Sequence, residues 1–207
     1  MKKIPFFFPS ILLAMLSGLL LISSCQNKAP EAVVATGMPS ELTHADLLSK
    51  GKYLVNGIGC GDCHTPKKFT AQGPVPDSNR ILSGYISGSP LPPIDKKALH
   101  PGYWLLFNPD LTASLGPWGI TYSANLTPDS LTGLGTWTED NFIKTLRTGK
   151  HLGQEGGRPL LPPMPWQDFS SLSDQDLRAI FVYLQSLPAV SNKVPAPKNP
   201  AEVAAMN

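Results

Sequence analysis

Two cysteines and a histidine lie within five residues of one another, in the sequence Cys60-Gly61-Asp62-Cys63-His64. Thiols separated by two residues can each add across a vinyl group of one haem, and the residue that follows then lies beneath the porphyrin. A histidine at this place binds the iron through its imidazole, the commonest proximal ligand of haem. The pentapeptide therefore predicts one covalently bound haem c, attached through thioethers at Cys60 and Cys63, with His64 as an axial ligand.

The same cysteine spacing occurs in two other kinds of site. A dithiol for redox exchange is expected between a buried strand and a helix, whereas the residues before Cys60 have the pattern of a helix. A structural zinc ion needs four ligands, and the one remaining cysteine is Cys25. Zinc would have to recruit His44, His100 or His151, none of which has the spacing of a second ligand pair. Haem attachment is the better interpretation.

A second iron ligand is expected opposite His64, and Met164 is the candidate. A thioether is a soft ligand, and His/Met coordination raises the reduction potential of haem iron. Prolines flank this residue in the run Pro162-Pro163-Met164-Pro165, which stiffens the loop. The other methionines lie in the terminal extensions: Met1, Met15, Met38 and Met206. A buried methionine is more often a packing residue, and His100 and His151 remain alternative ligands.

The N-terminus has the composition of an export signal. Lys2 and Lys3 precede an apolar run over residues 4–22, and Cys25 follows two serines. A short basic segment before an apolar one is typical of a secretory signal. The end of the run resembles the bacterial lipoprotein box, which implies that Cys25 is diacylated and becomes the first residue of the mature protein. An uncleaved membrane anchor is the alternative, although two prolines near the start of the run disfavour a helical span.

These features predict a lipoprotein signal peptide over residues 1–24 and a flexible tether over residues 25–40. Several acyl chains together hold a protein firmly to a bilayer. We therefore expect a protein that is exported and lipid-anchored to the bacterial cell envelope, facing the periplasm. Covalent haem attachment agrees with this location, because in bacteria the attachment is expected to take place in the periplasm.

Composition limits the remaining possibilities. A chain of 207 residues suits one domain with extensions. The formal charge of +2 is too small to indicate nucleic acid binding, and no basic run is interleaved with aromatic residues. Charged residues are 15% of the chain, which also holds 22 prolines and 18 glycines. This composition is typical of a compact domain with long loops.

Three helices are expected in a domain over residues 41–190. The first, residues 43–56, has Thr43 as its N-cap, and Gly51 would allow another helix to cross closely. The second, residues 136–147, is capped by Thr136 or Thr138. The third follows Ser173 and ends before Pro188. Residues 191–207 are rich in Pro, Lys and Ala, and we expect them to be a disordered tail.

Between the first two helices, residues 65–123 are interrupted by proline. Residues 104–107 and 120–122 have the pattern of short strands in a hairpin. The aromatic residues of this loop either line one edge of the haem or form a satellite core: Trp104, Phe107, Trp118 and Tyr122. The expected fold is mostly α: a cytochrome c domain of three main helices around one haem, with a long Pro/Gly-rich loop insertion.

Several longer runs resemble the cytochrome c subunits of bacterial membrane-bound alcohol and sugar dehydrogenases. They are Tyr122 to Asp129, Gly133 to Asp140, Leu146 to Gly149, Pro163 to Trp166 and Leu177 to Leu184. The resemblance covers roughly residues 43–190. It implies haem thioethers at Cys60 and Cys63 and axial ligation by His64 and Met164. Such subunits usually carry three haem domains in tandem, whereas this chain has a single C-x-x-C-H. This departure from the family's pattern favours a stand-alone, lipid-anchored monohaem carrier.

The haem needs further polar partners. The second ring nitrogen of His64 should meet an acceptor, commonly a backbone carbonyl. In cytochromes of this type a proline carbonyl soon after the motif accepts this hydrogen bond, and Pro74 or Pro76 would fit. The propionates need donors, for which the candidates are Asn125, Trp118, Arg80 and Arg158.

With both axial positions filled by protein, the chain is expected to be an electron carrier and not itself an enzyme. Its expected partners are redox proteins: a dehydrogenase, a quinol oxidoreductase or a terminal oxidase. One alternative is a haem peroxidase or a ligand-sensing haem protein, in which Met164 leaves the iron. Another is an interaction lipoprotein with a disulfide between Cys60 and Cys63, which gives His64 and Met164 no role.

Overall fold

The structure is a computed structural model, and it describes residues 41–206. The expected signal peptide over residues 1–24 and the tether over residues 25–40 lie outside the described residues, as does Cys25. These assignments stay predictions. Within residues 41–206, none of the helices has the length and apolar character needed to cross a membrane.

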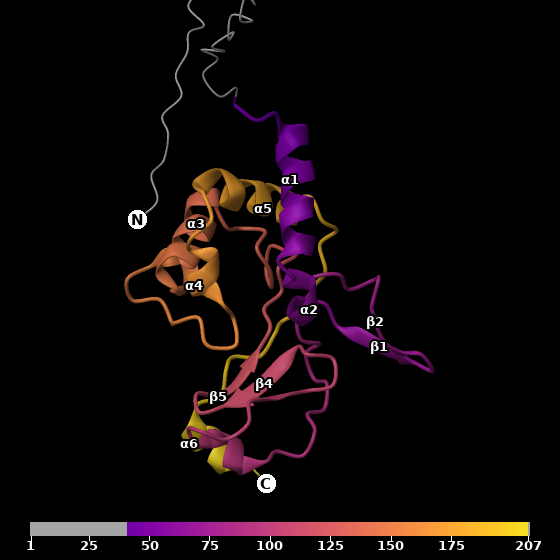
Figure 1. The fold of residues 1–207 in the computed structure, drawn as a ribbon, viewed down its shortest axis with the longest axis vertical. Helices are drawn as coiled ribbons and strands as arrows, with labels where there is room; N and C mark the ends of the chain where they lie inside the picture. Colours follow the sequence, from indigo (N-terminus) through magenta and orange to yellow (C-terminus); the bar gives the residue numbers. More distant parts are fainter. Residues whose placement is uncertain (1–40, 207) are drawn as a thin grey trace, which may run out of the picture. The chain divides into compact units, whose positions relative to one another are not determined.

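Three longer helices gather in the upper half of the described chain in Figure 1: α1 (His44–Gly57), α3 (Glu139–Thr148) and α5 (Asp174–Gln185). They are the helices that the sequence predicts. Thr43 caps α1 and Ser173 caps α5, each in a capping box with an aspartate three residues on. Thr138, and not Thr136, caps α3, and Gly149 ends it in a left-handed conformation. Shorter turns are η1 (Lys96–Leu99), η2 (His151–Gly153) and α4 (Trp166–Phe169).

The crossing of α1 and α5 depends on Gly51. A Cβ atom there would lie 2.0 Å from the carbonyl oxygen of Ala179 and 2.7 Å from the Cβ of Tyr183. The predicted close approach at Gly51 is therefore confirmed. Around this crossing lies the helical core, whose buried members are Val55, Leu82, Leu134, Phe142, Leu146, Leu177, Ile180, Phe181 and Leu184.

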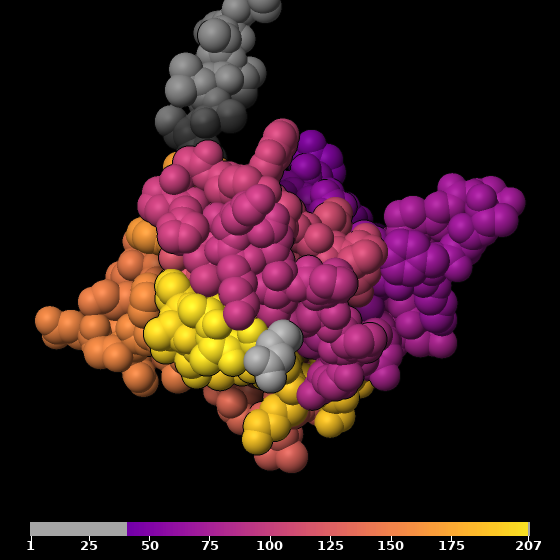
Figure 2. Space-filling model, turned by 90° about the horizontal axis from the view of Figure 1, so that it is seen from below, coloured from indigo at the N-terminus to yellow at the C-terminus, as the bar shows by residue number. Residues whose placement is uncertain are grey.

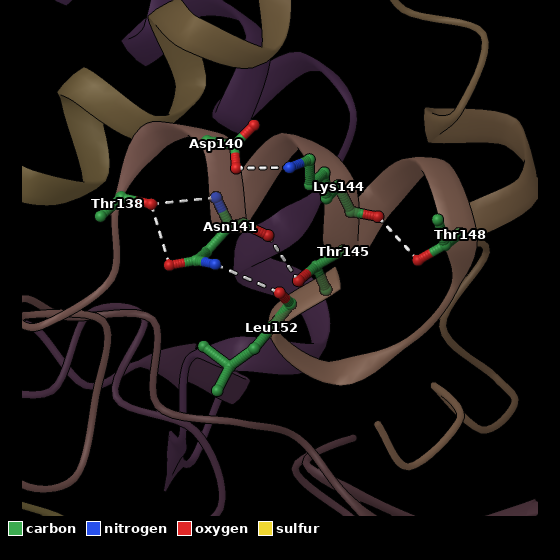
Figure 3. Close-up of polar contacts among 7 residues, drawn as sticks. All are labelled: Thr138, Asp140, Asn141, Lys144, Thr145, Thr148 and Leu152. Carbon is green, nitrogen blue, oxygen red and sulfur yellow. Dashed lines mark hydrogen bonds and ion pairs between the residues drawn. The ribbon is translucent and has the colours of Figure 1, made fainter. Parts of the chain in front are cut away.

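Polar contacts fix α3 and the loop that follows it (Figure 3). The Thr138 hydroxyl accepts a hydrogen bond from the backbone N–H of Asn141 at 3.1 Å. Lys144 and Asp140 form an ion pair of 2.7 Å one turn apart on the helix surface. The side-chain amide of Asn141 donates to the carbonyl of Leu152 at 3.3 Å. This last contact ties the loop after α3 back to the helix.

Two small antiparallel sheets occupy the region between the haem motif and α3. The first is a hairpin of β1 (Lys67–Thr70) and β2 (Gly73–Pro76). The second has the order β3 (Leu106–Phe107), β4 (Ala113–Gly116), β5 (Gly119–Tyr122). The expected hairpin between residues 104–107 and 120–122 is therefore wrong in its pairing, because β4 lies between those strands and pairs with both. β4 contains Ala, Ser, Leu and Gly and no β-branched residue, so its sequence carries little strand signal.

The two faces of the second sheet have different roles. Its register pairs Leu106 with Leu115 and Leu115 with Ile120, which places these side chains on one face. That face packs into the sheet core, whose buried members are Ala98, Leu115, Ile120 and Val203. The opposite face carries Phe107, Ser114 and Thr121, which the same register aligns.

The C-terminal segment is not a disordered tail, so that prediction is wrong. Lys198 exchanges backbone hydrogen bonds of 2.9 Å with Ile120, which extends the sheet at its edge. Asn199 then caps α6 (Pro200–Ala204), and Val203 is fully buried in the sheet core. Figure 2 shows the end of the chain in yellow against the magenta segment that contains the sheet. The Pro, Lys and Ala composition conceals this docking, because it depends on backbone pairing and one valine.

Candidate haem site

The motif Cys60–His64 forms a short helix, α2, directly after α1. Gly59 makes the turn between the two helices with a φ of 76°, a left-handed conformation that favours glycine. Cys60 and Cys63 are three residues apart, so their thiols lie on one face of the turn. Both thiols are free and partly exposed. The local fold thus presents the two thiols and the histidine together.

Burial disfavours the thiolate form of both cysteines. Burial raises the pKa of the Cys60 thiol to about 11. Burial also raises the pKa of Cys63, although the Lys67 ammonium opposes the shift. Redox dithiols have a lowered thiol pKa, so a thioredoxin-like role is disfavoured. In the described range, no group of three or more His, Cys, Asp or Glu side chains could hold a metal ion, so zinc finds no support there.

His64 is buried and its ring is oriented by one hydrogen bond. Its Nδ1 atom lies 2.8 Å from the carbonyl oxygen of Ala124. A carbonyl only accepts, so Nδ1 carries the proton and the Nε2 lone pair is left to bind a metal. Burial lowers the pKa of His64, although the bond to Ala124 opposes the shift, and the ring is therefore held neutral. A neutral imidazole with a fixed tautomer is the form that ligates iron.

The acceptor for His64 is therefore Ala124, and the expectation of Pro74 or Pro76 is wrong. Both prolines belong to β2, where the chain after the motif has turned into the β1–β2 hairpin. Ala124 instead approaches from a segment 60 residues along the chain. A backbone carbonyl can come from any residue type, so no side-chain pattern indicates it.

Residues 82–85 hold the Ala124 segment against the motif. The N–H of Gly84 donates to the carbonyl of His64 at 2.7 Å, and the N–H of Tyr85 donates to the carbonyl of Ser123 at 3.0 Å. Gly84 has a φ of 78°, and a Cβ there would lie 2.4 Å from the Ser123 oxygen. Sequence reasoning missed Gly84 and Ala124 as site residues. The one signal for Ala124 was its place in the run from Tyr122 to Asp129.

Met164 is half-buried and packs against the helical core, which Cys60 also contacts. Its loop is joined to β5, because the Thr121 hydroxyl donates to the carbonyl of Pro162 at 3.0 Å. Of the competing histidines, His100 is exposed after η1, whereas His151 packs edge-on, with 5.2 Å between ring centres, against Trp137, which itself packs on the helical core. Met164 thus shares the helical core with the haem motif.

The four residues proposed to bind the haem propionates differ in the contacts that they already make. The Asn125 amide already donates to Val190 and Thr132, so it is occupied within the protein. Trp118 is different, because its Nε1 is buried without a hydrogen-bond partner among the described residues. Burial also lowers the pKa of the Arg158 guanidinium, a cation that a carboxylate would stabilise. Arg80 lies near enough to help lower the pKa of Asp77, although the ammonium of Lys68 is the main cause.

The position of Trp118 follows from the sheet. Its indole ring covers the place where a Cβ on Gly116 would lie, with ring atoms 2.6 to 2.9 Å away. Gly116 follows Ser114 by two residues in β4, so its Cβ direction is toward the face that carries Thr121. Thr121 in turn contacts the loop of Met164. Trp118 therefore lies on the side of the sheet that faces the sixth-ligand candidate.

The four aromatic residues of the long loop have separate positions. Phe107 shares the Met164-facing side of the sheet with Trp118. Tyr122 packs against the sheet core and meets the Tyr85 ring at a tilt of 51°, so the satellite-core interpretation is correct for this residue. Trp104 is 74% exposed and packs in neither place.

Comparison with known proteins places these features in context. No family model matches the chain. The chain is 37% identical over 146 residues to the gluconate 2-dehydrogenase cytochrome c subunit of Pantoea cypripedii, covering 69% of this chain and 26% of that protein. It is 33% identical over 146 residues to the cytochrome c subunit of the quinone alcohol dehydrogenase of Gluconobacter oxydans, covering 69% and 24%. A diheme cytochrome c-type protein of Cereibacter sphaeroides is 26% identical over 158 residues, covering 74% and 41%.

The chain thus spans about a quarter of the length of the two dehydrogenase subunits that it matches. The resemblance to cytochrome c subunits of dehydrogenases, drawn from the sequence, is confirmed. The similar proteins are thus named as cytochrome c subunits of dehydrogenases and as a diheme cytochrome c-type protein.

Proposed function

We propose that this chain, similar to dehydrogenase cytochrome c subunits, is a monohaem c-type cytochrome that transfers single electrons and has no catalytic activity of its own. When bound, the haem supplies an iron that alternates between the ferric and ferrous states. The observation that carries the proposal is the hydrogen bond from His64 Nδ1 to Ala124. It leaves Nε2 free beside two unbonded thiols, Cys60 and Cys63.

In this proposal the residues have separate tasks. Cys60 and Cys63 would anchor the haem by thioethers, and His64 would bind the iron through its imidazole. Met164 would bind the iron through its thioether. Its place on the helical core supports this assignment, since Cys60 contacts the same core. With both axial positions filled, water and small ligands are kept from the iron.

Trp118 and Arg158 are the groups that would bind the haem propionates. An indole N–H that is buried without a partner is costly, and a carboxylate oxygen would satisfy it. Burial lowers the pKa of the Arg158 guanidinium, and a carboxylate beside it would stabilise its positive charge. Neither residue needs to move a proton or an electron for this role.

The proposal extends to location and partners. Diacylation at Cys25 would tether the protein to the bacterial cell envelope, and residues 25–40 would let the domain stand off the bilayer. A dehydrogenase is the favoured electron donor, because the similar proteins are named as subunits of gluconate, fructose and alcohol dehydrogenases. A quinol oxidoreductase or a terminal oxidase are the other partners that this role allows.

The test uses the full chain matured in cells that attach haem c. The reduced protein should give the α-band of a c-type cytochrome, and it should not take up carbon monoxide or cyanide rapidly. Met164→Ala should take up both and should have a lower reduction potential. Absence of the α-band would remove the proposal. Rapid ligand uptake by the parent would favour a peroxidase or a sensor, in which Met164 leaves the iron.

A further inference from the structure

One short segment of chain is hydrogen-bonded to both places from which the proposed iron ligands come. The Thr121 hydroxyl contacts the carbonyl of Pro162, two residues before Met164. The Ala124 carbonyl contacts Nδ1 of His64. Residues 121 and 124 are three apart, a span of at most about 10 Å in extended chain. Strand β5 and its continuation therefore tie the two ligand-bearing segments together.

The contact at Thr121 has a defined direction. The carbonyl of Pro162 can only accept, so the Thr121 hydroxyl donates its single proton to it. The Ser114 hydroxyl lies 2.6 Å from the Thr121 oxygen and must then be the donor in that pair. Ser114 is 5% exposed and Thr121 is 8% exposed, so water competes poorly for these hydroxyls. The result is a directed chain from Ser114 through Thr121 to Pro162.

Besides the packing of Met164 on the helical core and the backbone bond of 2.7 Å from the Leu160 N–H to the Gly149 carbonyl, the loop around Met164 has few polar contacts. Pro162, Pro163 and Pro165 have no backbone N–H to donate. Among the residues that the structure describes, Thr121 makes the only side-chain hydrogen bond to residues 159–165. The bond from Asn141 to Leu152 holds the same loop twelve residues before Met164 (Figure 3). Thr121 is therefore the side chain that fixes the end of the loop carrying the thioether.

We propose that Thr121 is the positioning residue for Met164, and that its hydroxyl keeps the thioether in place opposite His64. The inference rests on the proposed function, because it assumes an iron between these two side chains. Thr121 touches neither the iron nor the haem in this role. Loss of its hydroxyl leaves the haem attached and frees the loop, so the sixth position opens more often to a ligand from solution.

The experiment measures imidazole binding to the ferric, haem-loaded full chain by visible spectroscopy, with the reduction potential recorded on the same samples. Thr121→Val keeps the shape and the strand preference and removes the donor. Thr121→Ser keeps a hydroxyl at the same place and is the rescue variant. Ser114→Ala removes the neighbouring hydroxyl and leaves the bond to Pro162. Met164→Ala is the reference for an open sixth position.

Thr121→Val should bind imidazole about fivefold more tightly than the parent, the effect of losing one net hydrogen bond that stabilises the closed loop. Its reduction potential should move toward that of Met164→Ala. Thr121→Ser should bind imidazole within about twofold of the parent. The affinity of Ser114→Ala for imidazole should lie between those of Thr121→Ser and Thr121→Val. Equal binding by the parent and Thr121→Val, with tight binding by Met164→Ala, would overturn this inference and leave His/Met ligation standing. Equal binding by the parent and Met164→Ala would overturn both.

Discussion

The helical core and the sheet core hold their parts of the site by different means. The helical core contains nine buried residues, mostly Leu and Phe, and the haem motif follows directly from one of its helices. The sheet core contains four buried residues, two of which are alanine and valine. The sheet and the segments that adjoin it, residues 83–124 and 190–206, are called the sheet region here. Because so small a core contributes little burial, this region depends on hydrogen bonds from Asn192, Lys198 and Thr121. Burial positions the thiols, whereas hydrogen bonds with the sheet region hold the His64 ring and the loop of Met164.

This difference implies that substitutions in the two regions should affect different properties of the protein. A defect in the helical core should lower stability and haem loading together. A defect in the sheet region should cost less stability and should change the environment of the iron in a protein that still carries haem. Four substitutions test this contrast.

Leu177→Ala should have the largest effect. Leu177 is fully buried in the helical core, and truncating such a leucine costs about 2–5 kcal/mol of unfolding free energy. Urea unfolding followed by circular dichroism would measure it. Leu131→Ala is the matched control, because Leu131 is 92% exposed and should change stability by about 0.5 kcal/mol or less. A loss below about 1 kcal/mol for Leu177→Ala would contradict the role of this core.

Gly51→Ala should cost about 1–3 kcal/mol, because the added methyl group meets the backbone of α5. Gly57→Ala lies in the same helix with nothing within 4 Å of the new Cβ, and it should be neutral or slightly stabilising. Thermal unfolding of the two variants side by side gives the comparison. Equal melting temperatures would mean that α1 and α5 do not cross at Gly51.

Asn192→Ala tests the sheet region. Its side chain donates to the carbonyls of Ser83 and Tyr85 and accepts from the N–H of Ser87, so the substitution leaves three backbone groups without a partner. The expected cost is about 1–2 kcal/mol, with haem loading retained and imidazole binding increased. Asn79→Ala, at an exposed position, is the control. Loss of haem loading in Asn192→Ala would contradict the proposed difference between the two regions.

The smallest expected effect is a pH dependence at His151. Burial, aided by Arg158, lowers the pKa of His151 below its ordinary value of 6.5. As the pH falls, His151 is therefore protonated in the unfolded chain at a higher pH than in the folded chain. The unfolding free energy is unaffected by this ring above pH 6.5 and falls below it. The fall in unfolding free energy between about pH 7.5 and about pH 5.5 should be smaller in His151→Gln than in the parent. An equal fall in both proteins would exclude this contribution.

The helical region was predictable because its signals are local. Thr43 and Ser173, which cap α1 and α5, predict where these helices start, and Gly51 predicts a close helix crossing. The haem motif itself is a contiguous pentapeptide. Each of these signals can be read within a window of a few residues, because the physical cause lies in neighbouring side chains.

Two strands of the sheet region, β3 and β5, overlap segments that the sequence predicts, but their pairing and contacts were not predictable, because the determinants are distant and use backbone atoms. Ala124 acts on His64 through a carbonyl that every residue possesses. The docking of Lys198 on Ile120 is likewise a backbone pairing between segments far apart in sequence. Thr121 is one threonine among many in the chain until the fold brings it to Pro162. For these contacts the sequence supplies the residue type but not the partner.

The most direct test of the central claim is the mass of the intact, matured chain, measured under denaturing conditions. A haem joined through thioethers at Cys60 and Cys63 survives denaturation, so the account predicts the mass of the mature, acylated polypeptide increased by one haem. The variant with both cysteines replaced by serine should lose this increment. A parent chain that carries no haem, or has instead lost two hydrogens to a disulfide, would contradict the account.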